Sequence, residues 1–116
     1  WNHNQSLGWH RLDHAGHKGV HALVRDLNKT YTSTPALYER DCEASGFKWL
    51  IGGDVENSVF AFARFGDGAD VAVAVANFTP IPREDYRVGV PAGGHYREAF
   101  NSDAAQYGGL YIFRFI

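Results

Sequence analysis

Five histidines near the start of the chain are the first candidates for a metal site. His17 and His21 lie four positions apart, a spacing that presents two imidazoles to one metal ion when the segment is helical. A metal-dependent hydrolase motif would place a glutamate directly after the first histidine, and this chain has Lys18 there. We therefore expect histidines that face solvent near a helix start, and we predict no metal ligand and no cofactor.

Acidic residues and one thiol gather at residues 39–43, which read ERDCE. Paired carboxylates act as acid and base where burial or mutual proximity separates their pKa values, and a polar loop provides neither. Cys42 has no histidine beside it to activate a thiolate. The glycine pairs at 52–53, 93–94 and 108–109 do not precede a helix in a phosphate-binding pattern. The sequence therefore predicts no catalytic residue.

Aromatic residues on or beside expected strands are the candidates for binding: Trp49, Tyr86, Tyr96 and Tyr107. A flat ring exposed on a sheet can stack against the apolar face of a sugar, whereas most aromatic residues of a sandwich pack in its core. Trp49 is the best candidate because Phe47 and Ile51 share its face in a short strand while Leu50 takes the other face. Trp49 is thus the predicted carbohydrate-binding residue, and core packing is the alternative.

One helix is predicted over residues 17–32. Its apolar residues fall at helical spacing and form one stripe: Val20, Leu23, Val24, Leu27 and Tyr31. Thr34-Pro35 ends the helix, and the next four residues, 35–38, favour one further turn with proline at its first position. Trp1 and Trp9 precede the helix in a segment without regular period, so we expect that segment to pack against a body outside this chain.

Strand patterns follow the helix at 47–51, 57–65, 71–78, 86–90, 95–101 and 110–116. In the third, valines at 71, 73 and 75 alternate with alanines, so both faces are apolar and we predict a central strand buried on both sides. A Gly-Asp-Gly turn at 66–68 joins the second and third strands as a hairpin. The predicted fold class is mainly β: an antiparallel β-sandwich preceded by one amphipathic helix.

Composition limits the classes of partner. The chain has 116 residues with 45% apolar residues, which suffices for one domain with a sizeable core. The net charge of −2 without a basic run gives no reason to expect nucleic acid, and no apolar run reaches membrane-spanning length. The chain contains no methionine, so we expect residue 1 to lie inside a longer protein or to follow processing.

Several segments together resemble one family: SLGWHRLD (6–13), VRDLNKTY (24–31), GFKWL (46–50), NFTPIPR (77–83) and REAFNSDAAQYGG (97–109). This set is similar to the C-terminal end of bacterial 1,4-alpha-glucan (glycogen) branching enzymes, in the alpha-amylase superfamily. The resemblance implies that residues 1–34 are the end of the catalytic (β/α)8 barrel region, including its last helix. Residues 35–116 would be the C-terminal all-β domain, incomplete or with an atypical end after 109, since LYIFRFI does not match the family.

The resemblance also implies a function. The parent would be a glycosyltransferase that forms α-1,6 branches in α-1,4-glucan, a cytoplasmic enzyme of glycogen biosynthesis. Its catalytic carboxylates lie in upstream motifs without a counterpart here, so the isolated fragment is expected to be inactive and structural or accessory. The alternative is a weak glucan-binding module with a surface site at Trp49. The implied partners are glycogen or another α-glucan through the parent enzyme, and the upstream barrel. The helix stripe and the tryptophan segment without an evident partner separately predict self-association of the isolated fragment.

Overall fold

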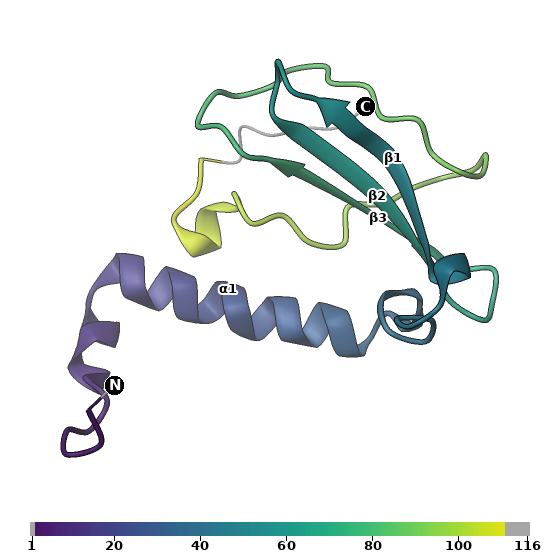
Figure 1. Cartoon of the computed structure of the whole chain (residues 1–116). Coiled ribbons are helices and arrows are strands. Elements are labelled where there is room, and N and C mark those ends of the chain that lie inside the picture. The colour runs from purple at the N-terminus through teal and green to yellow at the C-terminus, as the bar shows by residue number, and fades with distance from the viewer. Residues whose placement is uncertain (1, 111–116) are drawn as a thin grey trace.

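The computed structural model describes residues 2–110 and shows a long helix beside a three-stranded antiparallel sheet (Figure 1). The helix α1 spans Ala15–Thr32, and the strands are β1 (Phe47–Asp54), β2 (Val59–Phe65) and β3 (Val71–Asn77). The short 3-10 helices are η1 (Trp9–Asp13), η2 (Pro35–Leu37), η3 (Ala44–Gly46) and η4 (Ala105–Tyr107). The predicted order, one helix followed by antiparallel strands, is confirmed.

The helix α1 begins two residues before its predicted start and ends at Thr32 as expected. The chain then makes the predicted further turn as η2, with Pro35 at its first position, where a missing N–H and a fixed φ are favourable. Ala36 within this turn is fully buried, and the turn packs on β2 and β3. The turn η2 therefore joins the helix to the sheet.

The predicted apolar stripe of α1 is mostly open to solvent. Leu23 is half-buried, but the other four members are between 43% and 62% exposed: Val20, Val24, Leu27 and Tyr31. The side of α1 that is covered carries buried Gly19 and half-buried Asp26 and Thr30 instead. Hydrophobic periodicity thus located the helix correctly. The side of the helix that the described residues cover, however, is not the apolar stripe.

The strand β2 lies at the centre of the sheet, between β1 and β3. Val59, Ala61 and Ala63 on its inner face are fully buried. The pairing of β2 with β3 runs without a register shift from Val59 opposite Asn77 to Phe65 opposite Val71. Gly66 and its neighbours form the predicted hairpin between these two strands.

The prediction that residues 71–78 form a central strand is wrong, because β3 lies at an edge of the sheet among the described residues. Its residues are half-buried along the whole strand. Val73 and Val75 pair with Ala63 and Ala61 and so share the buried inner face. The alanines of β3 lie beside the phenylalanines of β2 on the other face. Both faces of β3 are thus partly covered, which produces the apolar alternation without a strand on each side.

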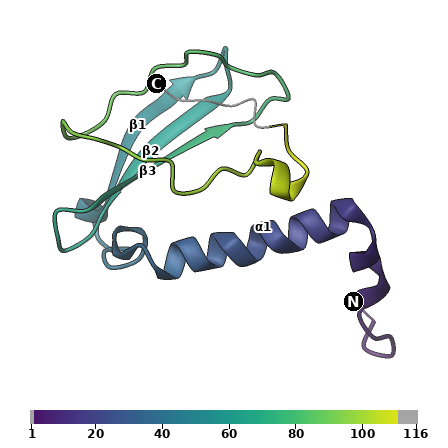
Figure 2. The same ribbon diagram turned by 180° about the vertical axis from the view of Figure 1, so that it is seen from behind.

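The strands predicted at 86–90 and 95–101 are wrong as well. In the structure these segments are irregular, apart from an isolated bridge residue at Tyr86, and they form a long loop that leads from the sheet to η4 (Figure 2). Pro91, Gly93 and Gly94 lie between the two segments, and strand propensity is realised only where a partner strand is available. The strand predicted at 110–116 lies outside the described residues, except for Leu110.

A polar cluster holds this loop against the end of the β1–β2 hairpin. The Tyr86 hydroxyl donates to the Asp54 carboxylate at 2.5 Å, and the Asn57 side-chain amide donates to both oxygens of Asp54 at 3.0 and 2.9 Å. The Tyr86 hydrogen bond, followed by those of Asn57, lowers the pKa of Asp54. The same hydrogen bond raises the pKa of Tyr86 above its ordinary value of 10.0.

The two shifts predict how the free energy of unfolding depends on pH. Asp54 has a lowered pKa in the folded state, so its contribution is present above about pH 4 and is lost as the pH falls through the folded pKa. Tyr86 has a raised pKa, so its contribution is present below about pH 10 and is lost as the pH rises through the folded pKa. Because Tyr86→Phe removes the hydrogen bond between the two groups, it should reduce the loss of unfolding free energy at acidic pH and also the loss at alkaline pH.

Urea unfolding at several pH values measures this dependence. Tyr96→Phe is the matched control, because the Tyr96 hydroxyl donates to the carbonyl oxygen of Ala92 rather than to an acid. Equal pH profiles for the parent and Tyr86→Phe would contradict the role given to the Asp54–Tyr86 hydrogen bond.

Candidate carbohydrate-binding surface

Trp49 is exposed on the outer face of the sheet, opposite the face that carries the buried residues of β2. Trp49 is 55% exposed, and it lies opposite Phe62 of β2 in the strand pairing. Gly52 lies close beside the indole, since a Cβ at that position would be 3.6 Å from the ring. Within residues 2–110, Trp49 therefore lies on an exposed face of the sheet and is not packed in a core, which was the alternative.

Trp49 is one member of a continuous row of aromatic rings, which we call the aromatic row: Phe47, Trp49, Phe60, Phe62 and Phe78. Ring centroids are 5.1 Å apart for Phe47 and Trp49 and 6.1 Å apart for Trp49 and Phe62, both edge-to-face. Phe60 continues the row, 6.2 Å from Trp49 and 5.4 Å from Phe78. Such pairs stabilise one another and hold the rings in place.

The outer face of the aromatic row is open. Phe47 and Phe60 are 39% and 38% exposed, and Phe78 is 72% exposed. Sequence reasoning singled out Trp49 but not Phe60 or Phe78. Phe60 could have been predicted from its alternation with Ala61 on a strand that pairs with β1. Phe78 could have been predicted from its position where β3 meets the proline-containing loop.

Because of a bulge in β1, one of the two residues predicted to share the face of Trp49 lies on the other face. Trp49 pairs with Phe62 and Ile51 pairs with Ala61, so the register shifts at Leu50. The extra residue moves Ile51 to the inner face with Ala61. Phe47 does share the face of Trp49, as predicted, whereas Ile51 does not.

The other aromatic candidates have engaged hydroxyl groups. Tyr86 donates to Asp54 and Tyr107 donates to the Asp26 carboxylate at 3.0 Å. Both residues are half-buried. Tyr96 donates to a main-chain carbonyl oxygen at 3.1 Å. Among the aromatic residues proposed from sequence, Trp49 is thus the one whose ring lies on an open sheet face.

The residues considered for other chemistry are arranged as structural or solvent-facing groups. The Asp41 carboxylate pairs with Arg64, and the Glu39 carboxylate accepts from the Asp67 main-chain N–H at 2.8 Å. Cys42 is an exposed free thiol. Between residues 2 and 110, no group of three or more His, Cys, Asp or Glu side chains is placed to hold a metal ion.

The described residues also include no helix that is long and apolar enough to cross a membrane. His17 and His21 line a shallow apolar hollow between η1 and α1, together with Leu7, Trp9 and Val20. Trp9 is 65% exposed there and Leu7 is 72% exposed. This hollow is continuous with the open stripe of α1 through Val20.

The chain belongs to the family described as "Alpha amylase, C-terminal all-beta domain", whose model matches residues 49–114. The match begins within β1, at Trp49, and covers β2 and β3 completely. Together with the helix α1 that precedes it in the structure, the match confirms the predicted class, a mainly β domain of the alpha-amylase type preceded by a helix.

Curated relatives over almost the whole chain carry the name 1,4-alpha-glucan branching enzyme GlgB. One from Burkholderia cenocepacia is 57% identical over 107 residues, which cover 92% of this chain and 14% of that protein. One from Rhodospirillum rubrum is 57% identical over 110 residues, and one from Cereibacter sphaeroides is 53% identical over 109 residues. Each match covers 94% of this chain and 15% of the relative. The resemblance found in the sequence is confirmed, and the chain spans about one seventh of the length of these relatives.

Proposed function

We propose that this chain is the C-terminal part of a 1,4-alpha-glucan branching enzyme and serves there as a structural and accessory domain. The observation that carries the proposal is the likeness to branching enzymes over more than nine-tenths of the chain. The described residues support an accessory role, because the carboxylates of Glu39 and Asp41 bind the Asp67 main chain and Arg64 of β2 instead of facing each other across a cleft.

The parent enzyme would cleave an α-1,4 linkage through a covalent glycosyl-enzyme and re-form an α-1,6 branch. That chemistry is a retaining mechanism with two carboxylates, and both would come from the catalytic barrel outside this chain. Glycogen or another α-glucan would be the substrate, and the cytoplasm the compartment. Residues 1–34 would belong to the end of the barrel region and residues 35–116 to the β-domain.

The isolated chain should show no branching and no hydrolytic activity. Incubation with amylose, enzymatic debranching and counting of the released chain ends would measure new α-1,6 linkages. The Rhodospirillum rubrum branching enzyme is the positive control and heat-treated chain the negative one. Turnover well above the heat-treated sample would contradict the accessory role.

The surface that would meet the barrel is the open side of α1. Val20, Val24, Leu27 and Tyr31 form an apolar face that the described residues leave uncovered, and Trp9 extends it across η1. A contiguous exposed apolar surface is typical of an interaction site. Without the barrel, this surface would drive self-association of the isolated chain.

Leu27→Asp should therefore shift the isolated chain from associated species to monomer. Leu27 is 46% exposed, so the change should leave the thermal melting temperature nearly unaltered. Lys18→Asp is the matched control, because Lys18 is exposed on α1 away from the stripe. Sedimentation velocity over a range of concentrations measures the association state, and a monodisperse monomer for the parent chain at high concentration would count against the proposal.

A second candidate function is weak binding of a glucan chain at Trp49, favoured by the open aromatic row. One aromatic contact contributes about 0.5–1.5 kcal/mol beyond the burial of area. A surface site of this kind therefore binds near the millimolar range, where the total binding free energy is about 4 kcal/mol. Such a surface would hold the glucan substrate without taking part in the reaction.

Trp49→Ala should abolish retardation of the chain on a native gel that contains glycogen, because the stacking ring is lost. The fold should survive, since the ring lies on the open face of the sheet, and a thermal melt beside the gel checks this. Tyr96→Ala is the control, a partly exposed aromatic residue outside the aromatic row. A folded Trp49→Ala variant that binds glycogen as well as the parent would refute the sugar contact.

A further inference from the structure

Residues 101–110 lie over one side of α1 and form a short segment that we call the strap. Both ribbon views place η4, the centre of the strap, next to the N-terminal half of α1 (Figures 1 and 2), and the two elements are in contact. The strap covers the side that carries Gly19 and Asp26, away from the open apolar stripe. It joins parts of the chain that are 81 residues apart.

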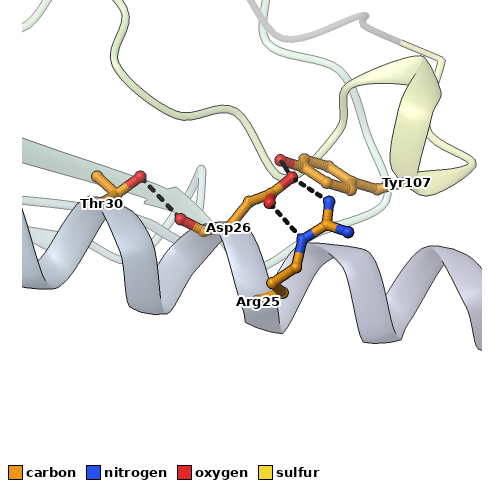
Figure 3. A network of polar contacts seen from close by, with 4 residues as sticks. All are labelled: Arg25, Asp26, Thr30 and Tyr107. Atoms are coloured by element: carbon orange, nitrogen blue, oxygen red, sulfur yellow. Dashed lines mark hydrogen bonds and ion pairs between the residues drawn. The ribbon is translucent and has the colours of Figure 1, made fainter.

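A charged hydrogen-bond network holds the strap to the helix (Figure 3). The Tyr107 hydroxyl donates to the Asp26 carboxylate at 3.0 Å, and the Arg25 guanidinium donates to both oxygens of that carboxylate at 2.8 and 3.2 Å. Hydrogen bonds to a charged group are stronger than those between neutral groups. Asp26 therefore fixes the phenol of Tyr107 on the helix surface.

Close backbone packing provides a second attachment. Gly19 is buried, and a Cβ at this position would overlap the main-chain carbonyl of Tyr107. Gly16 lies three residues earlier in the same helix, and a Cβ there would meet no atom within 4 Å. The strap thus needs glycine at position 19 but not at position 16.

The strap has its own internal order. The Asp103 N–H donates to the Asn101 side chain at 2.9 Å, and the Leu110 N–H donates to the Asp103 carboxylate at 3.1 Å. Gly108 has a φ of 90°, which glycine adopts readily, and it ends η4. The strap is therefore a turn that its own hydrogen bonds help to hold together.

We propose that the strap is a hinged closure, which opens from α1 locally while the sheet remains folded. After Tyr86, the connection at 87–100 contains no helix and no strand, and none of the residues 87–110 is fully buried. Segments with few buried contacts can open locally below the energy of global unfolding. Opening would uncover Gly19 and Asp26. It would also uncover half-buried Leu23, which lies four residues after Gly19 and three before Asp26 and so shares their side of the helix. This inference does not depend on the proposed branching-enzyme function.

Thiol labelling tests the strap directly. In a Cys42→Ser background, Leu23→Cys places a thiol on the covered side of α1, and Ala63→Cys in a separate protein reports global opening of the sheet. Gly19→Ala should raise the labelling rate at position 23 about tenfold through loss of close packing, and Tyr107→Phe should do the same through loss of its hydrogen bond. The rate at position 63 should stay unchanged.

Gly16→Ala is the matched control, since it makes the same chemical change in the same helix without touching the strap. It should leave the rate at position 23 unaltered. The proposal is overturned if neither Gly19→Ala nor Tyr107→Phe labels position 23 faster than Gly16→Ala does. It is also overturned if positions 23 and 63 always accelerate together, because the strap would then open only when the sheet unfolds.

Discussion

The pairing of β2 with a strand on each side is the constraint on which the rest of the structure depends. Val59, Ala61 and Ala63 are fully buried on its inner face, and the intervening Phe60 and Phe62 project to the outer face. Because the register between β2 and β3 is continuous, this alternation separates an inner apolar layer from an outer aromatic one. Loss of the β2 register by one residue would exchange the two faces.

Within residues 2–110, the aromatic row on the sheet and the apolar stripe on the helix remain open once the sheet and α1 are in place. They lie on different elements and need different partners. A flat row of rings suits a carbohydrate chain, whereas a stripe along a helix suits another packed protein surface. A domain that holds substrate at one surface and packs on a catalytic body at the other fits the proposed place at the end of a branching enzyme.

The local features of this fold could be predicted from the sequence, whereas those that need a distant partner could not. The period of residues 17–32 located α1, and the Gly-Asp-Gly turn located the β2–β3 hairpin. The alternation at Val71 showed that both strand faces are covered but not how many strands flank it. The bulge at Leu50 was hidden because apolar residues occupy both sides of it. The contact of Gly19 with Tyr107 depends on chain closure over many residues, which no local pattern encodes.

Residue-level amide hydrogen exchange of the isolated chain, measured by NMR, tests the central role of β2 most directly. Exchange reports the free energy of opening at each amide. The structure predicts that the amides of β2 exchange most slowly and that those at 86–101, which lie outside the sheet ladder, exchange much faster. Protection at 86–101 equal to that of β2 would contradict this account, because it would place a further paired strand in the fold.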